Sequence, residues 1–369
     1  MVIGITGAEG LVDWHMRCFL KGLPGISVKT AGRDTFQSQE AMGAFVQGCD
    51  AIVHLAGLNR GDDQGLYDTN MNLTQGLVNA CEVADVRPHI VFSSSTHVER
   101  DTAYGRSKRD CAALLGEWSA RQGAAFTELI LPHVFGEGGV PFYNSAVSTF
   151  CHQIAHGEVP VVNGEGRLEP VHAQTVAQRI LGILQQREEG RIRLEGHPIS
   201  VRDLYERLLG LANDYAGQIL PDLRDPFDLD LFNTYRSYLF PASYPVPLKR
   251  HTDSRGSLVE TVKSRQGGQT FISDTWPGIT RGNHYHLRKV ERFLVLSGEA
   301  VIRLRRLGST EVLSFPVSGR EPSFIDMPTM HTHSITNTGS DPVLTLFWSN
   351  EIFDPASPDT YPDPVILNA

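Results

Sequence analysis

The sequence predicts an α/β fold with a doubly wound parallel sheet, followed by a smaller all-β domain. In the first two-thirds of the chain, short apolar runs alternate with longer stretches that carry apolar residues at helical spacing. This alternation indicates a parallel sheet covered by helices on both faces. From about residue 247 onward, short apolar runs are separated by turn signals roughly every eight to twelve residues, which is typical of a sandwich or a small barrel.

The strands of the predicted parallel sheet are rich in Val, Ile, Leu and Phe and are closed by Gly, Ser or Pro. They are expected at 2–6, 51–57, 89–95 and 126–132, and a second strand in chain order is expected to end near 28–33. Apolar residues at helical spacing predict helices at 68–84 and 104–122.

The predicted strands of the all-β domain are the short apolar runs at 257–262, 269–274, 292–298, 300–307, 311–317, 323–328, 333–339 and 343–350. The stretch 220–245 joins the two parts and is rich in Pro and aromatic residues, which favours a packed connector over a flexible linker. We therefore expect two domains, 1–245 including this connector and 246–369.

Composition excludes several classes of protein. The 369 residues are 41% hydrophobic and 20% charged, which is ordinary for a folded chain and excludes a disordered one. The net charge of −9 argues against a binder of nucleic-acid polymers, which needs a surplus of cations.

Membrane insertion and an oxidising compartment are also disfavoured. No apolar run reaches the ~18 to 20 residues that span a bilayer. The five cysteines are scattered, and none forms a CxxC pair, which favours a reduced, cytoplasmic setting with buried thiols.

A glycine-rich turn follows the first predicted strand. Gly4, Gly7 and Gly10 lie in GITGAEGLVD, where glycine permits a tight turn and a close approach of backbone N–H groups to a pyrophosphate. This arrangement is typical of a Rossmann-like dinucleotide site. Asp13 stands where a further glycine is usual, and it places a carboxylate near the expected phosphates.

Two other segments are expected to contact the dinucleotide. Arg33 precedes Asp34 after the second strand, and a cation there favours NADPH over NADH because it pairs with the extra phosphate. Leu55 and Ala56 end the next strand in HLAG, where small residues let a cofactor pass close to the backbone.

A Ser/Tyr/Lys set provides the candidate catalytic residues of the first domain. Tyr104 and Lys108 are four residues apart and share a helix face. A nearby ammonium is expected to lower the pKa of the phenol, which can then exchange a proton with a substrate oxygen. Ser95, or Ser94 as the alternative, ends the preceding strand and offers a hydroxyl to hold that oxygen.

With the glycine turn, SSS and YGRSK, the first domain resembles the extended short-chain dehydrogenase/reductase family. The resemblance implies NAD(P)-dependent chemistry on nucleotide-activated sugars, with Tyr104 and Lys108 as the catalytic pair and Ser95 as their partner. The segment 131–139 resembles the substrate-side stretch of that family, except that His133 stands where Asn is usual.

The last third contains a metal-ligand pattern. His284 and His286 form an HxH pair whose imidazoles point to one face of a strand, because strand side chains alternate. Glu291 follows on the next strand, and His333 lies in a later PxxxxHxxxN frame. Three imidazoles and one carboxylate suit a divalent first-row metal with an open position.

This two-part pattern resembles the cupin motif. The usual glycine of the second part is Met330, and His331 is an additional imidazole. The alternative is a metal-free cupin whose histidines line a core or a sugar pocket. HTDSRGSLVE at 251–260 resembles the opening of nucleotide-sugar epimerases of the cupin class, with Arg255 as a candidate grip for a phosphate, or simply a surface residue of a turn.

A reductase followed by a cupin resembles the bifunctional capsular-polysaccharide enzymes over almost all of the chain. The resemblance implies Zn as the metal, a UDP-2-acetamido-2,6-dideoxy-4-hexulose as the substrate, and often a homodimer. The cupin would epimerise C3, with Glu291, His331 and Tyr285 as candidate bases, and the reductase would then reduce C4 with NADPH.

Other functions remain open at this point. Asp13 and His133 are also compatible with a degenerate reductase domain beside an active cupin, so that the chain would be only a metal-dependent sugar epimerase or isomerase. A non-catalytic nucleotide-sugar-binding protein and an Fe-dependent cupin oxygenase are further alternatives. The intact Tyr104, Lys108 and four metal-ligand candidates argue against a protein without activity.

Overall fold

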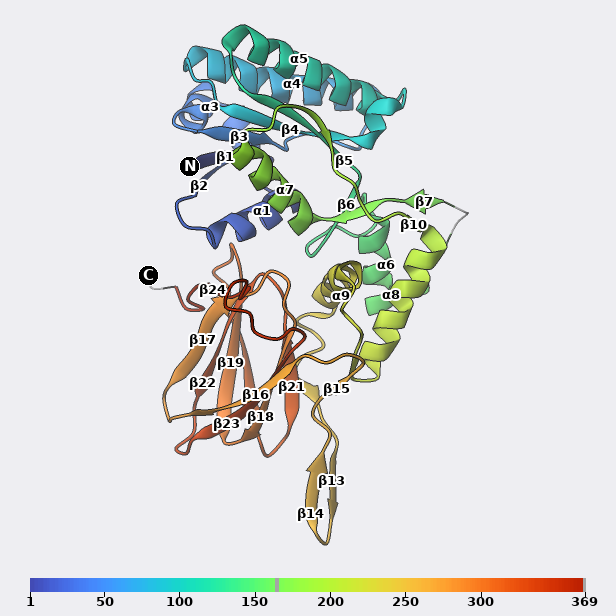
Figure 1. Ribbon diagram of the computed structural model, residues 1–369, viewed down its shortest axis with the longest axis vertical. Helices are drawn as coiled ribbons and strands as arrows, with labels where there is room; N and C mark the ends of the chain where they lie inside the picture. Colours follow the sequence, from blue (N-terminus) through green and yellow to red (C-terminus); the bar gives the residue numbers. More distant parts are fainter. Residues whose placement is uncertain (163–165, 368–369) are drawn as a thin grey trace. The chain divides into compact units, whose positions relative to one another are not determined.

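The computed structural model describes residues 1–162 and 166–367, which divide into two compact units (Figure 1). The first unit holds residues 1–135 and 167–199, and the second holds 136–166 and the chain from 200 onward. The helices at Val201–Ala216 and Pro226–Leu239 therefore belong to the same compact unit as the β-rich region. The predicted domain boundary at 245–246 stays a prediction.

A six-stranded parallel sheet forms the centre of the first unit, in the order β2-β1-β3-β4-β5-β9. The chain runs from β1 to β2 on one side and then crosses to β3 on the other side of β1. In such a sheet, the carboxyl ends of the strands at this switch open a crevice for a ligand. The strands are β1 (Val2–Thr6), β2 (Ser27–Ala31), β3 (Ala51–His54), β4 (His89–Ser95), β5 (Phe126–Leu131) and β9 (Gly190–Arg193).

Helices cover both faces of this sheet, as predicted (Figure 1). One face packs against α1 (Leu11–Lys21) and α7 (Ala173–Gln186), and the other against α3 (Gln39–Val46), α4 (Asp63–Val83) and α5 (Ala103–Gln122). The shorter elements are α2 (Arg33–Phe36), η1 (Thr96–Glu99), β6 (His133–Phe135), β7 (Arg167–Leu168), β8 (Pro170–His172) and β10 (Ile199–Ser200).

The predicted connector is a packed helix, α9 (Pro226–Leu239), in the second unit. Asp225 caps it by accepting a hydrogen bond from Phe227 N, and Pro226 occupies its first turn, where no N–H is needed. Leu231 and Phe232 are fully buried. The same unit contains α6 (Ala146–Ala155), α8 (Val201–Ala216), β11 (Ile219–Leu220) and β15 (Lys263–Ser264).

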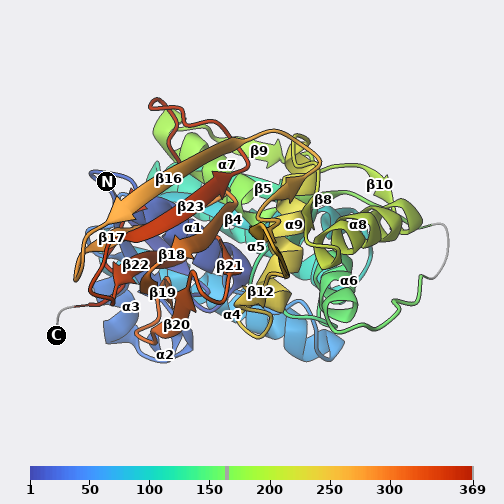
Figure 2. The same ribbon diagram turned by 90° about the horizontal axis from the view of Figure 1, so that it is seen from below.

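The β-rich region consists of two five-stranded antiparallel sheets, with the orders β12-β21-β18-β23-β16 and β20-β19-β22-β17-β24 (Figure 2). Alternate apolar side chains from both sheets, such as Phe293, Ile302 and Phe347, form one core. The strands are β12 (Val246–Pro247), β16 (Gln269–Thr275), β17 (Thr280–Tyr285), β18 (Glu291–Ser297), β19 (Glu299–Arg306), β20 (Leu313–Ser318), β21 (Ser323–Met327), β22 (His331–Asn337), β23 (Val343–Ser349) and β24 (Tyr361–Pro362).

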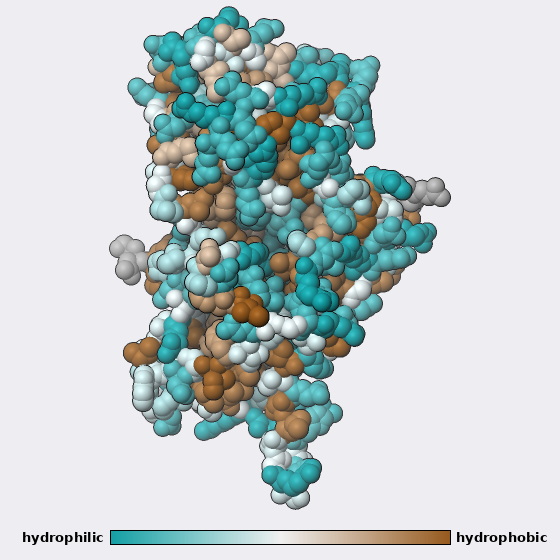
Figure 3. Space-filling model, in the orientation of Figure 1, coloured by the Kyte–Doolittle hydropathy of each residue, from teal (hydrophilic) through white to brown (hydrophobic). Residues whose placement is uncertain are grey.

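A hairpin of β13 (Arg250–Asp253) and β14 (Gly256–Val259) projects from the β-rich region (Figure 1). Its tip is hydrophilic or neutral on the surface (Figure 3). Arg255 at this tip forms an exposed ion pair with Asp253. Within the described part of the chain, no helix is long and apolar enough to cross a membrane.

An ion pair lies inside the β-rich region. Arg292 donates two parallel hydrogen bonds to Asp326, with distances of 2.7 and 2.8 Å, and both side chains are at most 1% exposed. The guanidinium carbon also lies 3.5 Å from the ring centroid of Phe324, and Tyr215 donates to the same carboxylate. Loss of one partner therefore leaves a buried charge without compensation.

We predict that Asp326→Ala lowers the free energy of unfolding by about 3–5 kcal/mol, because Arg292 stays buried and unpaired. Urea denaturation followed by fluorescence measures the change. Glu82→Ala is the matched control, because it removes one partner of a solvent-exposed pair with Arg121 and should cost less than about 1 kcal/mol. Equal losses in the two variants would contradict a special role for the buried pair.

Candidate functional site

The first site is built on the turn between β1 and α1. Gly7 adopts a φ of +83°, which side-chain-bearing residues rarely adopt. A Cβ atom at Gly7 would lie 2.9 Å from Ala56 N, so only glycine fits against the backbone that follows β3. Gly7 N also donates to Ala31 O of β2 at 3.0 Å. The predicted contact segments at Gly7 and Leu55–Ala56 therefore lie side by side.

The N-terminus of α1 opens onto this turn. Gly10 is its N-cap, and within the described residues no side chain caps the helix there. Its first N–H groups and positive dipole end suit an anionic group such as a pyrophosphate. Arg33 is exposed and begins α2, two residues after the end of β2. The glycine turn, this helix end and the nearby cation fit a dinucleotide.

A buried histidine fixes the end of β3, and the sequence analysis did not single it out. His54 Nδ1 lies 2.7 Å from Thr6 Oγ1, and its Nε2 lies 3.2 Å from Thr74 Oγ1. Thr6 Oγ1 in turn accepts a hydrogen bond from Ala56 N at 3.1 Å. Burial lowers the pKa of His54 to about 3, so the ring is neutral. The network holds Ala56 against the glycine turn.

Asp13, the departure from the glycine pattern, has a partner. It is fully buried in the first turn of α1, and Arg17 one turn later forms an ion pair with it at 2.8 Å. Burial raises the pKa of Asp13, and Arg17 opposes this rise. Arg17 also donates to Ala8 O inside the glycine turn. The carboxylate is thus charge-compensated beside the proposed phosphate site.

The Ser/Tyr/Lys set meets at the start of α5. Thr102 caps this helix by accepting from Gly105 N, which sets Tyr104 and Lys108 one turn apart. Tyr104 is hydrogen-bonded with Ser95. The alternative residue, Ser94, instead donates to Glu128 at 2.8 Å. The structure therefore brings Ser95, and not Ser94, to the phenol.

The electrostatics of this pair differ from the expectation of a lowered phenol pKa. Burial raises the pKa of Tyr104, and the hydrogen bond with Ser95 only partly opposes it. Burial also lowers the pKa of Lys108 to about 8. Lys108 Nζ donates to Ser93 O at 2.7 Å and lies 5.8 Å from the centroid of the Tyr104 ring. Desolvation therefore dominates, and the phenol is protonated at neutral pH.

Asn70 on α4 is a second residue that the sequence analysis missed. Its amide pairs with both backbone groups of Leu58, accepting from N at 2.6 Å and donating to O at 2.9 Å. It also donates to Ser107 on α5 at 3.0 Å. One side chain thus joins the loop after β3 to the helix that carries Tyr104 and Lys108. Its signal in the sequence was only an amide inside an amphipathic helix.

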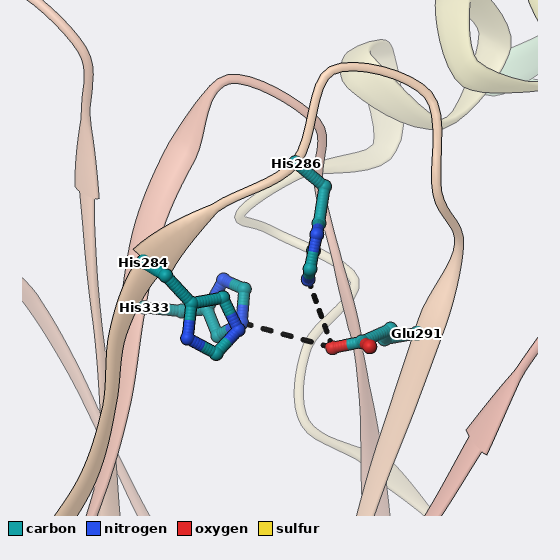
Figure 4. A group of neighbouring side chains, drawn as sticks. All are labelled: His284, His286, Glu291 and His333. Carbon is teal, nitrogen blue, oxygen red and sulfur yellow. Dashed lines mark hydrogen bonds and ion pairs between the residues drawn. The ribbon is translucent and has the colours of Figure 1, made fainter. Parts of the chain in front are cut away.

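The second site is a group of four side chains in the β-rich region (Figure 4). His284, His286, Glu291 and His333 each place one ligand atom within 4.8 Å of the others. His286 Nε2 lies 3.0 Å and His333 Nε2 3.8 Å from Glu291 Oε2. The predicted set is brought together from β17, the turn after it, β18 and β22. The register of β17 against β22 shifts at a bulge between Gly282 and His284. His286 lies one residue beyond the end of β17.

The protonation states suit metal ligation. Burial lowers the pKa of His284 to about 4 and that of His333 well below its usual value, so both rings are neutral. Burial alone would raise the pKa of Glu291, but the surrounding imidazoles, His286 above all, lower it to about 2. Glu291 is thus an anionic ligand candidate, and its carboxylate in turn raises the pKa of His286 against the effect of burial.

One buried atom supports this interpretation. His333 Nε2 is buried and, among the described residues, has no hydrogen-bond partner. A buried polar nitrogen without a partner is costly, and a metal ion satisfies it. Two further imidazoles and a carboxylate converge on the same point. The four residues therefore fit a divalent metal.

Three other residues of the predicted pattern have different surroundings. Met330 adopts a φ of +56°, which explains why glycine is usual there. His331 lies outside the group of four: its ring packs 5.1 Å from that of Phe240, and its Nδ1 contacts Thr329 O. Tyr285 is fully buried and stacks on Tyr361. Of the candidate bases, only Glu291 lies within the group.

Comparisons with known proteins match both parts of the chain. Residues 5–194 match the NAD dependent epimerase/dehydratase family, and residues 251–361 match the polysaccharide biosynthesis C-terminal domain. The chain is 31% identical, over 98% of both sequences, to a UDP-2-acetamido-2,6-beta-L-arabino-hexul-4-ose reductase of Pseudomonas aeruginosa.

Solved structures give the same picture. The crystal structure of the capsular polysaccharide assembling protein CapF from Staphylococcus aureus is 31% identical, covers 99% of this chain and 100% of its own, and has a TM-score of 0.64. An NADPH complex of RMD from Pseudomonas aeruginosa is 19% identical over 57% of this chain and 82% of its own, with a TM-score of 0.53, and shows the fold alone.

We predict that Arg17→Ala weakens dinucleotide binding about 5- to 10-fold. The variant leaves Asp13 buried without its cation, and a negative charge in the first turn of α1 then opposes a bound phosphate. Titration calorimetry with NADPH measures the effect. The double variant Asp13→Asn/Arg17→Ala removes the charge and should recover most of the affinity. Unchanged binding by Arg17→Ala would contradict the compensation.

Proposed function

This chain belongs to the family of CapF and of the UDP-2-acetamido-2,6-beta-L-arabino-hexul-4-ose reductase, and we propose that it is a bifunctional nucleotide-sugar enzyme of capsular polysaccharide biosynthesis. Membership establishes an oxidoreductase-type enzyme that carries an NAD dependent epimerase/dehydratase domain. The observation that carries the proposal is that one chain holds both a Ser95/Tyr104/Lys108 group and a three-histidine, one-carboxylate group.

We propose that the substrate is a UDP-2-acetamido-2,6-dideoxy-4-hexulose. The name of the Pseudomonas relative describes a UDP-linked 4-ketosugar of this class. Epimerisation at C3 followed by reduction at C4 converts it to a 6-deoxy-talosamine-type sugar, on the route to UDP-N-acetyl-L-fucosamine. The C4 ketone is needed for both reactions, because it acidifies the C3–H and accepts the hydride.

In the proposed reduction, the first unit binds NADPH, which supplies the hydride to C4. The backbone at Gly7 and Gly10, with the N-terminus of α1, holds the pyrophosphate, and Arg33 pairs with the extra phosphate. Tyr104 donates its proton to the new C4 oxygen, and Ser95 hydrogen-bonds the same oxygen. The raised pKa of Tyr104 supports its role as a proton donor, because the phenol stays protonated until the negative charge develops on the C4 oxygen.

In the proposed epimerisation, the β-rich region is a cupin domain that binds a divalent metal, with Zn favoured by the family resemblance. His284, His286, Glu291 and His333 are the proposed ligands. A metal bound there supplies a Lewis acid for the oxyanion that develops when the C3 proton leaves. A base removes the C3 proton from one face of the sugar, and a proton returns to C3 on the other face. The candidate bases are Glu291, which is also a proposed ligand, His331, whose ring packs on Phe240, and Tyr285.

We also propose a homodimer. The hairpin β13–β14 extends from the β-rich region with its side chains exposed, including Leu258 at 62%. An isolated two-stranded hairpin is only marginally stable in water, so a second copy of the chain would stabilise it.

The reductase half predicts that Tyr104→Phe lowers NADPH oxidation on the UDP-4-hexulose at least about 100-fold, because the proton donor is lost. NADPH affinity should stay within about twofold of the unchanged protein. Absorbance at 340 nm follows the reaction. Tyr67→Phe is the matched control, since its phenol only pairs with Asp110 at the surface, and it should keep full activity.

The two assays separate the possible failures. If the unchanged protein binds NADPH and Tyr104→Phe retains turnover, then Tyr104 is not the proton donor. If the unchanged protein does not bind NADPH, the reductase half of the proposal is wrong and only an epimerase remains.

The β-rich half predicts that chelation of the metal abolishes proton exchange at C3. Incorporation of solvent deuterium into the substrate, followed by mass spectrometry, should fall at least about 100-fold and recover with Zn²⁺. His286→Ala should cause the same loss, whereas His251→Ala in the exposed strand β13 should not. Persistent exchange in metal-free protein would disprove a catalytic metal.

A further inference from the structure

A segment late in the chain contacts the strand and the turn that carry His284 and His286 of the four-residue metal group. Residues 357–365, which we call the C-terminal strap, include β24. This strand pairs with β17 so that His284 lies opposite Pro362 and Tyr285 opposite Tyr361. The strap therefore continues the sheet on the edge of the strand that carries His284.

Asp359 of the strap holds the turn between His286 and Glu291. Its Oδ1 accepts from Leu287 N at 3.1 Å, and its Oδ2 accepts from Arg288 N at 3.0 Å and Lys289 N at 2.8 Å. The residue is 3% exposed and adopts a φ of +43°. One buried carboxylate thus satisfies three consecutive N–H groups of the turn that connects two proposed ligands.

The backbone of the same residue contacts a ligand directly. Asp359 O accepts a hydrogen bond from His286 Nδ1 at 2.5 Å. Since a carbonyl oxygen can only accept, Nδ1 carries a proton. Nε2 donates to the carboxylate Oε2 of Glu291 at 3.0 Å, and it is the nitrogen that gives up its proton when the ring ligates a metal. A partner of this kind fixes the tautomer and the ring orientation of a ligating histidine.

The strap is anchored on both sides of Asp359. Before it, Lys289 Nζ donates to Pro358 O at 2.7 Å. After it, Asp363 accepts from Arg305 and from Thr332, each at 2.5 Å, in a buried environment. Thr332 immediately precedes the proposed ligand His333 on β22. The strap therefore touches the backbone or side-chain neighbours of three of the four proposed ligands.

We propose that Asp359 is a positioning residue of the metal centre, which sets the tautomer of His286 through its carbonyl and the path of the His286–Glu291 turn through its carboxylate. This inference rests on the metal centre of the proposed function. In this role Asp359 does not bind the metal itself but orients two of the proposed ligands, His286 and Glu291.

The test is the Zn²⁺ affinity of the full-length protein, measured by competition with a chromophoric chelator. Asp359→Ala should weaken binding about 10- to 100-fold, which is the range for loss of a partner behind a metal ligand. Asp359→Asn keeps one accepting oxygen and should lose less. Asp354→Ala is the matched control, because this exposed carboxylate accepts only from Ala356 N in the same part of the chain, and its affinity should not change.

A second readout separates positioning from general loss of structure. The visible absorption of bound Co²⁺ reports ligand geometry and should change in Asp359→Ala but not in Asp354→Ala. NADPH affinity should stay unchanged in all variants, which shows that the first unit is intact. If Asp359→Ala does not fold, Asp359→Asn carries the test.

Each result has one meaning. Equal Zn²⁺ affinity in Asp359→Ala and the unchanged protein overturns the positioning role and leaves the metal centre in place. Equal weakening in Asp354→Ala also overturns it, because any loosening of the segment would then suffice. Absence of Zn²⁺ binding by the unchanged protein overturns both the metal centre and the role of Asp359.

Discussion

The carboxylate of Glu291 lies buried against the imidazole of His286, and much of the β-rich region serves to keep that arrangement. A buried carboxylate is costly unless charges or hydrogen bonds compensate it. Here the surrounding histidines outweigh burial and keep it ionised. The histidines in turn depend on a bulge in β17, on β22 and on a strap from late in the chain.

The same requirement recurs elsewhere in the molecule. Asp13 is buried with Arg17, and Asp326 with Arg292. Lys108 is buried next to a carbonyl instead of a carboxylate, and its pKa is correspondingly low. Asp13 and Asp326 are each paired with an arginine, whereas Lys108 lies next to a carbonyl and Glu291 is compensated by imidazoles, and perturbed groups of this kind are candidates for chemistry. This distinction separates the candidate sites from the rest of the buried charge.

Much of the fold was predictable because it depends on local patterns. Apolar runs located β1, β3, β4 and β5 to within a few residues, and turn signals located the short strands of the β-rich region. The ligand group was predictable for a related reason: HxH spacing and the strand period fix where imidazoles point. Met330 shows the limit of such patterns, since a backbone that usually needs glycine accepts a methionine here.

What the sequence could not predict depends on contacts between distant residues. Asp359 is 73 residues from His286, and no spacing rule links them. Asn70 and His54 act through hydrogen bonds to loops and strands that are brought near only by the fold. The predicted lowering of the Tyr104 pKa was wrong for the same reason, since the structure raises it. The sequence reveals a lysine four residues away, but not that the phenol is buried.

The unit boundary assigns part of the predicted reductase domain to the second unit. Residues 136–166 belong with the β-rich region, although their first part resembles the substrate-side stretch of the reductase. In this unit, Thr329 donates to Glu137 at 2.5 Å, and Tyr238 of α9 donates to Gly139 O at 2.7 Å. The stretch is thus bonded to the loop that leads into β22, the strand of His333.

The strap also determines when the metal group can assemble during folding. Joining His286 to Asp359 closes a loop of 73 residues, whereas the turn between β19 and β20 joins Leu304 to Leu313. The longer closure costs about 2 kcal/mol more chain entropy, because the cost grows with the logarithm of loop length. The β19–β20 hairpin can therefore form while the ligands are still apart. The contact between His286 and Asp359 is one of several long closures that the region needs, together with the pairing of Gln269 with Ser349.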